Sequence, residues 1–368
     1  MEAFTKARLR EASKTLPAEW YCSPAVFERE RERIFARSWI YAGRAEHVAG
    51  PGDFVLREVA GEELIVVRGR DGAIRALYNV CRHRGTRLCA EAAGRFAGSI
   101  VCPYHAWTYG FDGALLVARH MADSPGFDRA EYPLREAAVH EWNGFLFVSL
   151  AAEPEPFARE LAALDARFDP WRLGELRTVE TRGYDVACNW KLVFQNYSEC
   201  YHCPVIHPQL EALSPWDSGR NDLHEGPVLG GFSTLRPGTT GLTASGTSAR
   251  PPIAGLPAAE RERAYYYTIF PSLMLSLHAD YAMVHEVRPL AVDRTHVACS
   301  WLFETSTIAA PGFDASDAVT FWDQTNRQDW AIGERTQLGI ASRAYEPGPY
   351  AASEGLLAAF DRHYLSVV

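Results

Sequence analysis

Two short segments that each carry one cysteine and one histidine constrain this chain most: Cys81-Arg82-His83 and Cys102-Pro103-Tyr104-His105. Each follows an apolar, β-rich run, so two loops of one small domain are expected to bring two thiolates and two imidazoles together. A [2Fe-2S] cluster with two cysteines on one iron and two histidines on the other needs this ligand set. A zinc site with two cysteines and two histidines is the alternative, but zinc fingers usually pair cysteine with cysteine.

Bulk composition excludes several classes of protein. The chain has 368 residues, of which 47% are hydrophobic, which is enough for two domains with a sizeable core. A net charge of -9 argues against nucleic acid or an anionic membrane as the main partner. No apolar run reaches the ~18 residues of a membrane span, and the N-terminus lacks a secretory apolar region. We therefore expect a cytoplasmic protein with no membrane partner.

The eight cysteines are too few for a disulfide scaffold. In a reducing compartment they are expected to be metal ligands or buried thiols, and this expectation includes Cys200 and Cys203.

The pattern along the chain predicts an α+β protein in three parts. Residues 1–40 are expected to form an N-terminal helical segment that packs on the C-terminal domain, with one amphipathic helix over about 18–40. Residues 41–152 alternate short strands with Gly and Asp-Gly turns and predict a small antiparallel β domain. Residues 153–368 follow a Pro-rich joint and mix strands with helices. Within this last part, residues 226–258 predict a long loop, either a lid or disordered, and a closing helix is expected over 315–341.

A second group of chemically distinctive residues lies in Asn189–Pro208, which starts as a helix. Asn196, Glu199 and His202 recur every third residue and are expected on one face; Pro204 then disturbs the helix before His207. Two histidines and one carboxylate leave three positions of an octahedral Fe(II) free. The late helix offers two acids for that carboxylate, Asp323 and Asp329. Polar core histidines and a solvated helix acid are the plainer interpretation. A further set is interpreted as core or as cavity lining: His278, Asp280 and His285.

These motifs resemble those of Rieske non-haem iron oxygenases. The segments CRHRGTRL and CPYHAWTY resemble the two halves of the Rieske signature, and NWK followed by ECYHC resembles the family's iron-binding helix. Thr86 and Tyr104 stand where respiratory Rieske proteins carry extra cysteines, so the resemblance is to the oxygenase branch. Ala106 is a departure, since the family usually has glycine there.

The resemblance implies an α+β fold in which a small Rieske domain joins a larger catalytic domain with a helix-grip-like antiparallel sheet. It implies that Glu199 links His202 to cluster ligand His105 of a neighbouring subunit, and hence a homotrimer. Most members have Asp at this bridging position, and Glu is frequent in members that act on quaternary ammonium compounds. Asn196 is expected near the iron. The implied ligands are Cys81, His83, Cys102 and His105 for the [2Fe-2S] cluster, and His202, His207 and Asp329 for mononuclear Fe(II).

The implied activity is that of an oxygenase component, in which the cluster passes electrons and the Fe(II) activates O2. The chain shows no Gly-rich dinucleotide fingerprint, so a separate flavin- or ferredoxin-type NAD(P)H reductase is expected. Within the family, the sequence is most similar to the glycine betaine, carnitine and stachydrine subgroup. In that subgroup, hydroxylation of an N-methyl group releases formaldehyde. Rings for a cation-π cage are offered by Tyr197, Tyr201, Trp216, Phe232 and the run Tyr265-Tyr266-Tyr267.

Two other functions remain open at this point. The first is an aromatic-ring hydroxylase or an O-demethylase of an aromatic acid. The second is a Rieske electron-transfer protein without oxygenase activity.

Overall fold

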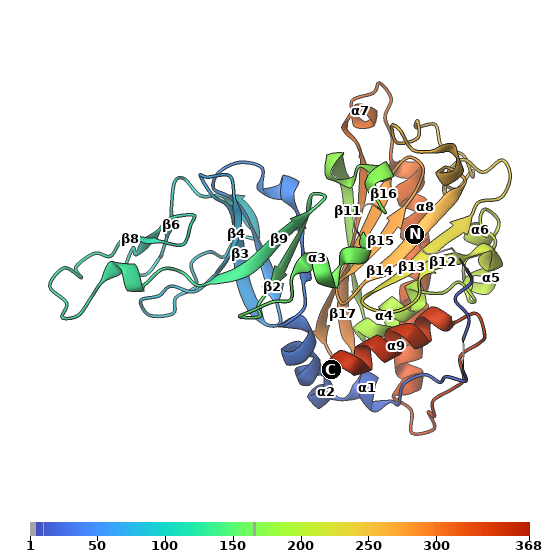
Figure 1. Cartoon of the computed structure of the whole chain (residues 1–368), viewed down its shortest axis with the longest axis horizontal. Coiled ribbons are helices and arrows are strands. Elements are labelled where there is room, and N and C mark those ends of the chain that lie inside the picture. The colour runs from blue at the N-terminus through green and yellow to red at the C-terminus, as the bar shows by residue number, and fades with distance from the viewer. Residues whose placement is uncertain (1–4, 10, 165–166) are drawn as a thin grey trace. The chain divides into compact units, whose positions relative to one another are not determined.

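The computed structural model describes residues 5–9, 11–164 and 167–368. The chain divides into two compact units, which are treated separately below. The smaller unit is Arg31–Pro156, and the larger unit contains the described residues up to Glu30 together with Phe157–Val368 (Figure 1).

The smaller unit is built from antiparallel strands. Its seven-stranded sheet has the order β1-β10-β9-β4-β3-β2-β5, and β6-β7-β8 form a separate three-stranded sheet. The strands are β1 (Ile40–Arg44), β2 (Asp53–Val59), β3 (Glu62–Arg68), β4 (Ile74–Tyr78), β5 (Ala93–Arg95), β6 (Ile100–Val101), β7 (Thr108–Tyr109), β8 (Leu115–Val117), β9 (Glu136–Trp142) and β10 (Phe145–Ser149). This arrangement confirms the small antiparallel β domain.

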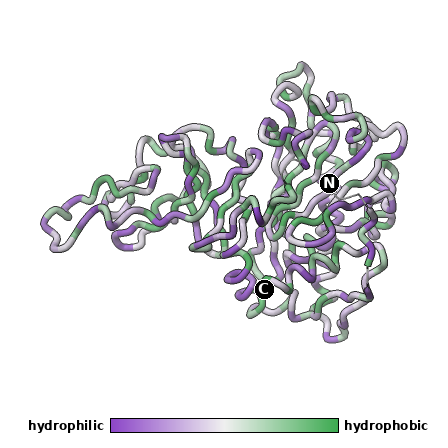
Figure 2. Tube along the Cα trace, viewed as in Figure 1, coloured by the Kyte–Doolittle hydropathy of each residue, from purple (hydrophilic) through white to green (hydrophobic). Residues whose placement is uncertain are grey.

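The larger unit contains one seven-stranded antiparallel sheet, in the order β11-β17-β16-β15-β14-β13-β12. Apart from β11 beside β17, each neighbour in the sheet follows directly along the chain. Figure 2 shows many hydrophobic residues along these strands, as expected for a sheet that supports a core. The strands are β11 (Leu176–Val186), β12 (Arg220–Leu223), β13 (Val228–Thr234), β14 (Arg263–Ile269), β15 (Leu273–Leu277), β16 (Ala282–Ala291) and β17 (Arg294–Glu304).

Two helices of this unit pack on each other and on the sheet: α4 contacts α8 and β16, and α8 contacts β11. A buried ion pair anchors α4, since Lys191 Nζ lies 2.5 Å from Glu30 Oε1 and both side chains are fully buried. The helices are α1 (Glu19–Cys22), α2 (Pro24–Glu30), α3 (Phe157–Glu160), α4 (Trp190–Tyr197), α5 (Cys203–Ile206), α6 (Pro208–Glu211), α7 (Thr305–Ile308), α8 (Ser316–Ile340) and α9 (Gly355–Val367). Helices on an antiparallel sheet confirm the α+β class.

Three local predictions were wrong. The single helix over 18–40 is instead α1, α2 and a π-helical turn, because Ser23 takes an extended conformation before Pro24. The long loop over 226–258 contains strand β13, and within it residues 226–227 and 235–257 lack helix and strand. Cys200 and Cys203 form a disulfide and are therefore neither free thiols nor metal ligands.

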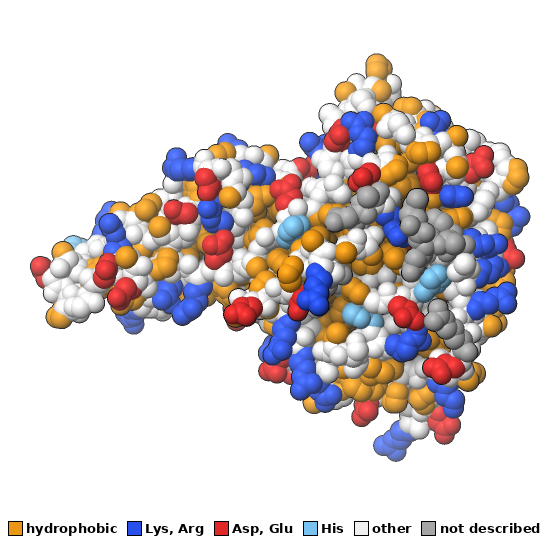
Figure 3. Space-filling model, in the orientation of Figure 1, with side chains coloured by type: hydrophobic (Ala, Val, Ile, Leu, Met, Phe, Trp, Pro, Cys, Tyr) orange, Lys and Arg blue, Asp and Glu red, His pale blue; other side chains and the backbone are white. Residues whose placement is uncertain are grey.

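The surface and the helices bear on possible partners. On the face shown in Figure 3, basic and acidic side chains are interspersed rather than gathered by sign. Within residues 5–9, 11–164 and 167–368, none of the helices combines the length and the apolarity needed to cross a bilayer.

Candidate metal centres

The first centre lies in the smaller unit, on two loops of the same form. Cys81 follows β4 and Cys102 follows β6, and both side chains are buried. The carbonyl of Cys81 accepts a hydrogen bond from Gly85 N (3.0 Å), and that of Cys102 accepts one from Ala106 N (3.1 Å). Gly85 and Ala106 both have positive φ, +75° and +54°. The alanine that departs from the Rieske pattern therefore occupies a glycine-type conformation, at a cost of roughly 1–2 kcal/mol.

The two histidines of these loops face each other beside the two cysteines. The ring centroids of His83 and His105 are 4.7 Å apart, and the His83 ring stacks on Trp107 at 4.8 Å. Burial, and then the nearness of His105, lowers the pKa of His83, which favours the neutral imidazole that binds metals. His83 Nδ1 is buried and has no hydrogen-bond partner among the residues that the structure describes. An unsatisfied buried nitrogen beside two buried thiols fits a metal cluster.

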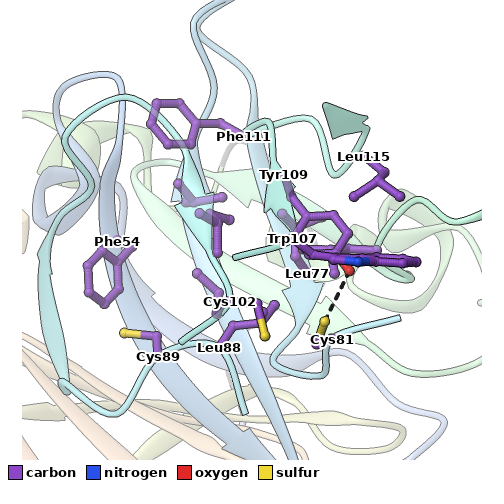
Figure 4. Close-up of a cluster of buried hydrophobic side chains, with 14 residues drawn as sticks. Phe54, Leu77, Cys81, Leu88, Cys89, Cys102, Trp107, Tyr109, Phe111 and Leu115 are labelled. Carbon is purple, nitrogen blue, oxygen red and sulfur yellow. Dashed lines mark hydrogen bonds between the residues drawn. The ribbon is translucent and has the colours of Figure 1, made fainter. Parts of the chain in front are cut away.

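The hydrophobic core encloses the two cysteines, as Figure 4 shows for Cys81 and Cys102 among aromatic and aliphatic side chains. The buried Tyr109 hydroxyl lies 3.3 Å from Cys81 Sγ and accepts a hydrogen bond from Arg82 N at 3.0 Å. Tyr109 therefore contributes a polar contact to one ligand atom. This contact was not predicted, because Tyr109 is in strand β7, 28 residues after Cys81.

The second centre lies in the larger unit, between the end of α4 and helix α8. His207 Nε2 is 2.8 Å from Asp329 Oδ1, and His202 Nε2 is 3.4 Å from the same oxygen. Ligand atoms of these three residues all lie within 4.8 Å of one another. In the part of the chain that the structure describes, they are the one compact group of His, Cys, Asp or Glu side chains suited to a single metal ion.

The charges around this triad favour a bound cation. Burial lowers the pKa of His202, but hydrogen bonds to Asp329 and Glu199 outweigh burial and raise it to about 10. Burial opposes ionisation of Asp329, yet the hydrogen bonds from His202 and His207 hold its pKa below the usual range. The two carboxylates therefore stabilise positive charge at this point. Two histidines and one carboxylate fit an iron with free positions.

Asp323, the alternative third ligand, points elsewhere. It accepts a hydrogen bond from Tyr184 Oη at 2.7 Å and forms ion pairs with Arg327 (3.0 Å) and Arg182 (2.9 Å). Asp323 is therefore already neutralised, whereas Asp329 meets the two histidines.

Glu199 contacts His202 directly: its Oε1 lies 2.5 Å from His202 Nδ1. Its Oε2 accepts hydrogen bonds from the backbone of Tyr201 and, at 3.4 Å, from that of His202. The prediction of one helical face for Asn196, Glu199 and His202 was wrong, because α4 ends at Tyr197. A turn after the helix, rather than the helix itself, brings Glu199 to His202.

A cavity of about 430 Å³ adjoins the triad. Its lining includes Asn196 and four of the predicted ring residues, namely Tyr197, Tyr201, Trp216 and Phe232. Of the run Tyr265-Tyr266-Tyr267 only Tyr266 lines it, because successive residues of β14 face opposite sides of the sheet. The lining residues that were not predicted include Trp322 of α8, Lys6 and Arg8.

The remaining polar set does not form a metal site. His285 Nε2 pairs with Asn326 Oδ1 at 3.1 Å, and Asp280 pairs with Arg250 at 2.9 Å. His278 stacks on Tyr281, with ring centroids 4.3 Å apart. Burial lowers the pKa of His278 to about 3 and, as the largest cause, that of His285 to about 4, so both are neutral core residues.

Comparison with known proteins agrees with both centres. Residues 38–131 match the family model of the Rieske [2Fe-2S] domain, and residues 173–368 match that of the ring hydroxylating alpha subunit (catalytic domain). The glycine betaine monooxygenase oxygenase subunit of Pseudomonas aeruginosa is 31% identical over 371 residues, covering 93% of this chain and 86% of that protein. The chain belongs to the Rieske-type ring-hydroxylating oxygenase family.

Two further relatives are similar. The carnitine monooxygenase oxygenase subunit of Acinetobacter baumannii is 37% identical over 196 residues, which is 53% of each chain. The crystal structure of the quaternary ammonium Rieske monooxygenase CntA with an inhibitor superposes with a TM-score of 0.82 at 25% identity, covering 96% of this chain and 95% of that one.

As a Rieske-type oxygenase, the protein is an oxidoreductase that carries a [2Fe-2S] cluster and a mononuclear iron. The relative from Pseudomonas aeruginosa is named as the oxygenase subunit of its enzyme. The residues present fit both groups: Cys81, His83, Cys102 and His105 suit the cluster, and His202, His207 and Asp329 suit the iron.

Replacing Tyr109 with phenylalanine is expected to lower the midpoint potential of the cluster by about 40 mV. Hydrogen bonds to the ligand sulfurs help set the potential of such clusters, and one hydrogen bond worth roughly 1 kcal/mol corresponds to that shift for one electron. Redox titration followed by visible circular dichroism measures it. Tyr132→Phe is the matched control, because Tyr132 packs on Trp107 within the same core. An unchanged potential in Tyr109→Phe would contradict the assigned contact.

Proposed function

We propose that this chain hydroxylates a methyl group of a quaternary ammonium compound, which then loses formaldehyde and becomes a tertiary amine. The observation that carries the proposal is the aromatic wall of the cavity beside the triad, which includes Tyr197, Tyr266 and Trp322. A quaternary ammonium has no N–H to donate and is held mainly by cation-π attraction to such rings. Two relatives are oxygenase subunits of a glycine betaine monooxygenase and a carnitine monooxygenase, which supports the same substrate class.

The cavity residues orient the substrate in this proposal. Tyr197 is fixed by a 2.7 Å hydrogen bond between its hydroxyl and Ser276 Oγ, and its ring lies 6.1 Å from that of Tyr266. The Trp322 indole N–H donates to Tyr281 Oη at 2.6 Å. These rings are held rigidly, so they position the ammonium group with little loss of side-chain entropy. Asn196 adds a polar group near the reacting methyl.

The triad His202, His207 and Asp329 is proposed to hold the mononuclear iron, which when bound supplies O2 activation. In the overall reaction one oxygen atom enters the methyl group and the other leaves as water. Two electrons come from NAD(P)H through a separate flavin- or ferredoxin-type reductase. We place the enzyme in the cytoplasm, where NAD(P)H and such reductases occur.

Glu199 is proposed to connect His202 with the cluster of a neighbouring subunit, through His105 of that subunit. Exposed apolar residues flank Glu199, notably Tyr201 (58% exposed) and Val205 (81% exposed). The smaller unit also exposes apolar side chains around its cluster loops, namely Val80, Val101, Tyr104, Leu116 and Val117. Apolar surface of this kind is typical of interfaces. A head-to-tail contact between copies closes into a ring, and we propose a homotrimer.

Oxygen uptake and formaldehyde release, measured with a surrogate reductase over a panel of methylated amines and aromatic acids, test the proposed function. We expect about one formaldehyde per O2 with a quaternary ammonium compound, because each hydroxylation consumes one O2, and no turnover of aromatic acids. Wild-type protein without reductase is the control. Turnover of an aromatic acid, with none of any methylated amine, would instead support a ring hydroxylase or O-demethylase. A reducible cluster without oxygen uptake on any of the substrates would support an electron carrier.

A further inference from the structure

Residues 5–9, here called the N-terminal strap, lie along the wall of the substrate cavity. Thr5 and Asn221 form an antiparallel bridge with two backbone hydrogen bonds, Thr5 N to Asn221 O (2.8 Å) and Asn221 N to Thr5 O (2.6 Å). Ala7 N donates to Asn221 Oδ1 at 3.2 Å, and Leu9 N donates to the carbonyl of Ala352 at 3.2 Å. The strap is thus fixed at both ends, by β12 and by the segment before α9.

Close packing fixes the middle of the strap. A Cβ atom added at Gly355 would lie 2.8 Å from the backbone C and O of Ala7 and 3.0 Å from the backbone C of Arg8. These distances are too short for any side chain. The first residue of α9 therefore has to be glycine while the strap is in place.

The strap puts positive charge at the cavity. Lys6, Ala7 and Arg8 all line the cavity, together with Asn221 and Ser353. Residues two apart in an extended segment share a face, so Lys6 and Arg8 lie on the same side of the strap. Both are exposed, and among the residues that the structure describes neither is assigned an ion-pair partner.

The cavity thus combines two chemically different regions. The aromatic rings beside the triad are buried or half-buried, as Tyr197, Tyr266 and Trp322 are, whereas Lys6 and Arg8 are exposed to solvent. A molecule with a quaternary ammonium at one end and a carboxylate at the other matches both regions. A bare cation matches only the aromatic region and is repelled by the strap.

We infer that Lys6 and Arg8 bind the carboxylate of the substrate and select zwitterionic betaines over quaternary ammonium alcohols. The inference rests on the proposed function and narrows its substrate class. Both side chains donate charge-assisted hydrogen bonds to a carboxylate, and Arg8 can do so with two parallel N–H groups. The rings hold the ammonium, and the strap determines which ammonium compounds are retained.

The test compares the wild-type protein, with its cluster and iron bound, with the Lys6→Met/Arg8→Met double variant. Glycine betaine and carnitine are the carboxylate substrates, and choline is the substrate that lacks the carboxylate. We expect the ratio of kcat/KM for betaine to that for choline to fall about tenfold or more, as two charge-assisted contacts are lost. The change should appear in KM and in calorimetric Kd rather than in kcat. Lys14→Met is the matched control, because Lys14 is also exposed but does not line the cavity, and the ratio should not change.

Gly355→Ala provides a second variant that leaves every charge in place. An added methyl group clashes with the strap backbone, so the same preference for carboxylate substrates should weaken. Equal losses for betaine and choline in both variants, or an unchanged ratio, would overturn the inference while the proposed function stands. Wild-type protein that binds and turns over no quaternary ammonium compound would overturn the proposed function, and the inference with it.

Discussion

Replacing Asp329 with asparagine is expected to abolish turnover, whereas the same change at Asp323 should leave most of the activity. Asp329 Oδ1 lies within 3.4 Å of the Nε2 atoms of both His202 and His207. As a ligand it brings a negative charge to the iron, which two neutral imidazoles do not. Loss of groups that merely orient metal ligands already costs 10–100-fold, so loss of a ligand charge should reduce turnover by more than about 100-fold. Iron should fall from three to two atoms per chain, with the cluster retained.

Iron analysis, the spectrum of the reduced cluster and oxygen uptake measure this prediction. Asp323→Asn is a closely matched control, because Asp323 is on the same helix and partly buried, and its partners are Tyr184, Arg182 and Arg327. Partly exposed ion pairs of this kind contribute roughly 0–1 kcal/mol, so a small loss of stability is expected there. Three irons per chain and full turnover in Asp329→Asn would show that Asp329 is not a ligand of the iron.

The cluster loops could be predicted because the residues that define each loop lie close together in the sequence. Cys81 with His83, and Cys102 with His105, lie within four residues of each other, and the paired Cys–His pattern is itself the signature.

The choice between Asp323 and Asp329 is different. They are six positions apart on α8, so they face directions about 120° apart. Which direction meets the histidines depends on packing against a segment that lies over 100 residues earlier, so the periodicity of α8 does not decide it. The prediction of Asp329 came instead from the resemblance to the family.

Strand β13 escaped prediction because of its glycines. Gly230 and Gly231 make Val228–Thr234 look like a loop, yet each is required by a close approach of neighbouring backbone. A Cβ at Gly231 would lie 2.0 Å from Arg220 O, and one at Gly230 would lie 2.2 Å from Tyr266 O. Glycine within a strand often marks such an approach. The strand also forms part of the cavity, since Phe232 lines it.

The N-terminal strap was missed for a related reason. Residues 5–9 have no hydrophobic period, and their structure comes from hydrogen bonds to Asn221 and Ala352, both over 200 residues away. Only the tertiary fold turns two ordinary basic residues near the N-terminus into part of a binding cavity. Local pattern thus identified the chemistry of the site, whereas the features that shape its selectivity depend on long-range contacts.

Replacing Glu199 with glutamine is expected to block electron delivery while leaving both metal centres intact. A carboxylate can accept a hydrogen bond from an imidazole N–H at each oxygen, whereas glutamine has one acceptor and presents an NH2 group to the second donor. In the isolated chain Oε1 lies 2.5 Å from His202 Nδ1, and the hydrogen bonds that Oε2 accepts from described residues come from backbone N–H groups. That second oxygen is the atom proposed to turn to the neighbouring subunit's His105. Breaking this bridge should slow reoxidation of the cluster by about 10–100-fold, the range for loss of a group that orients metal ligands.

Stopped-flow mixing of the reduced protein with O2 and substrate follows that reoxidation directly. Chemical reduction of the cluster should proceed at the wild-type rate in Glu199→Gln, and iron content should remain three per chain, which a variant with a merely damaged fold would not show. Glu199→Asp should restore part of the rate, because a carboxylate returns at a shorter reach. Glu346→Gln changes an exposed glutamate that does not line the cavity and should behave as wild type. If Glu199→Gln reoxidises as fast as the unmodified protein, electrons reach the iron by a route that avoids this side chain, and the principal argument for a ring of subunits is lost.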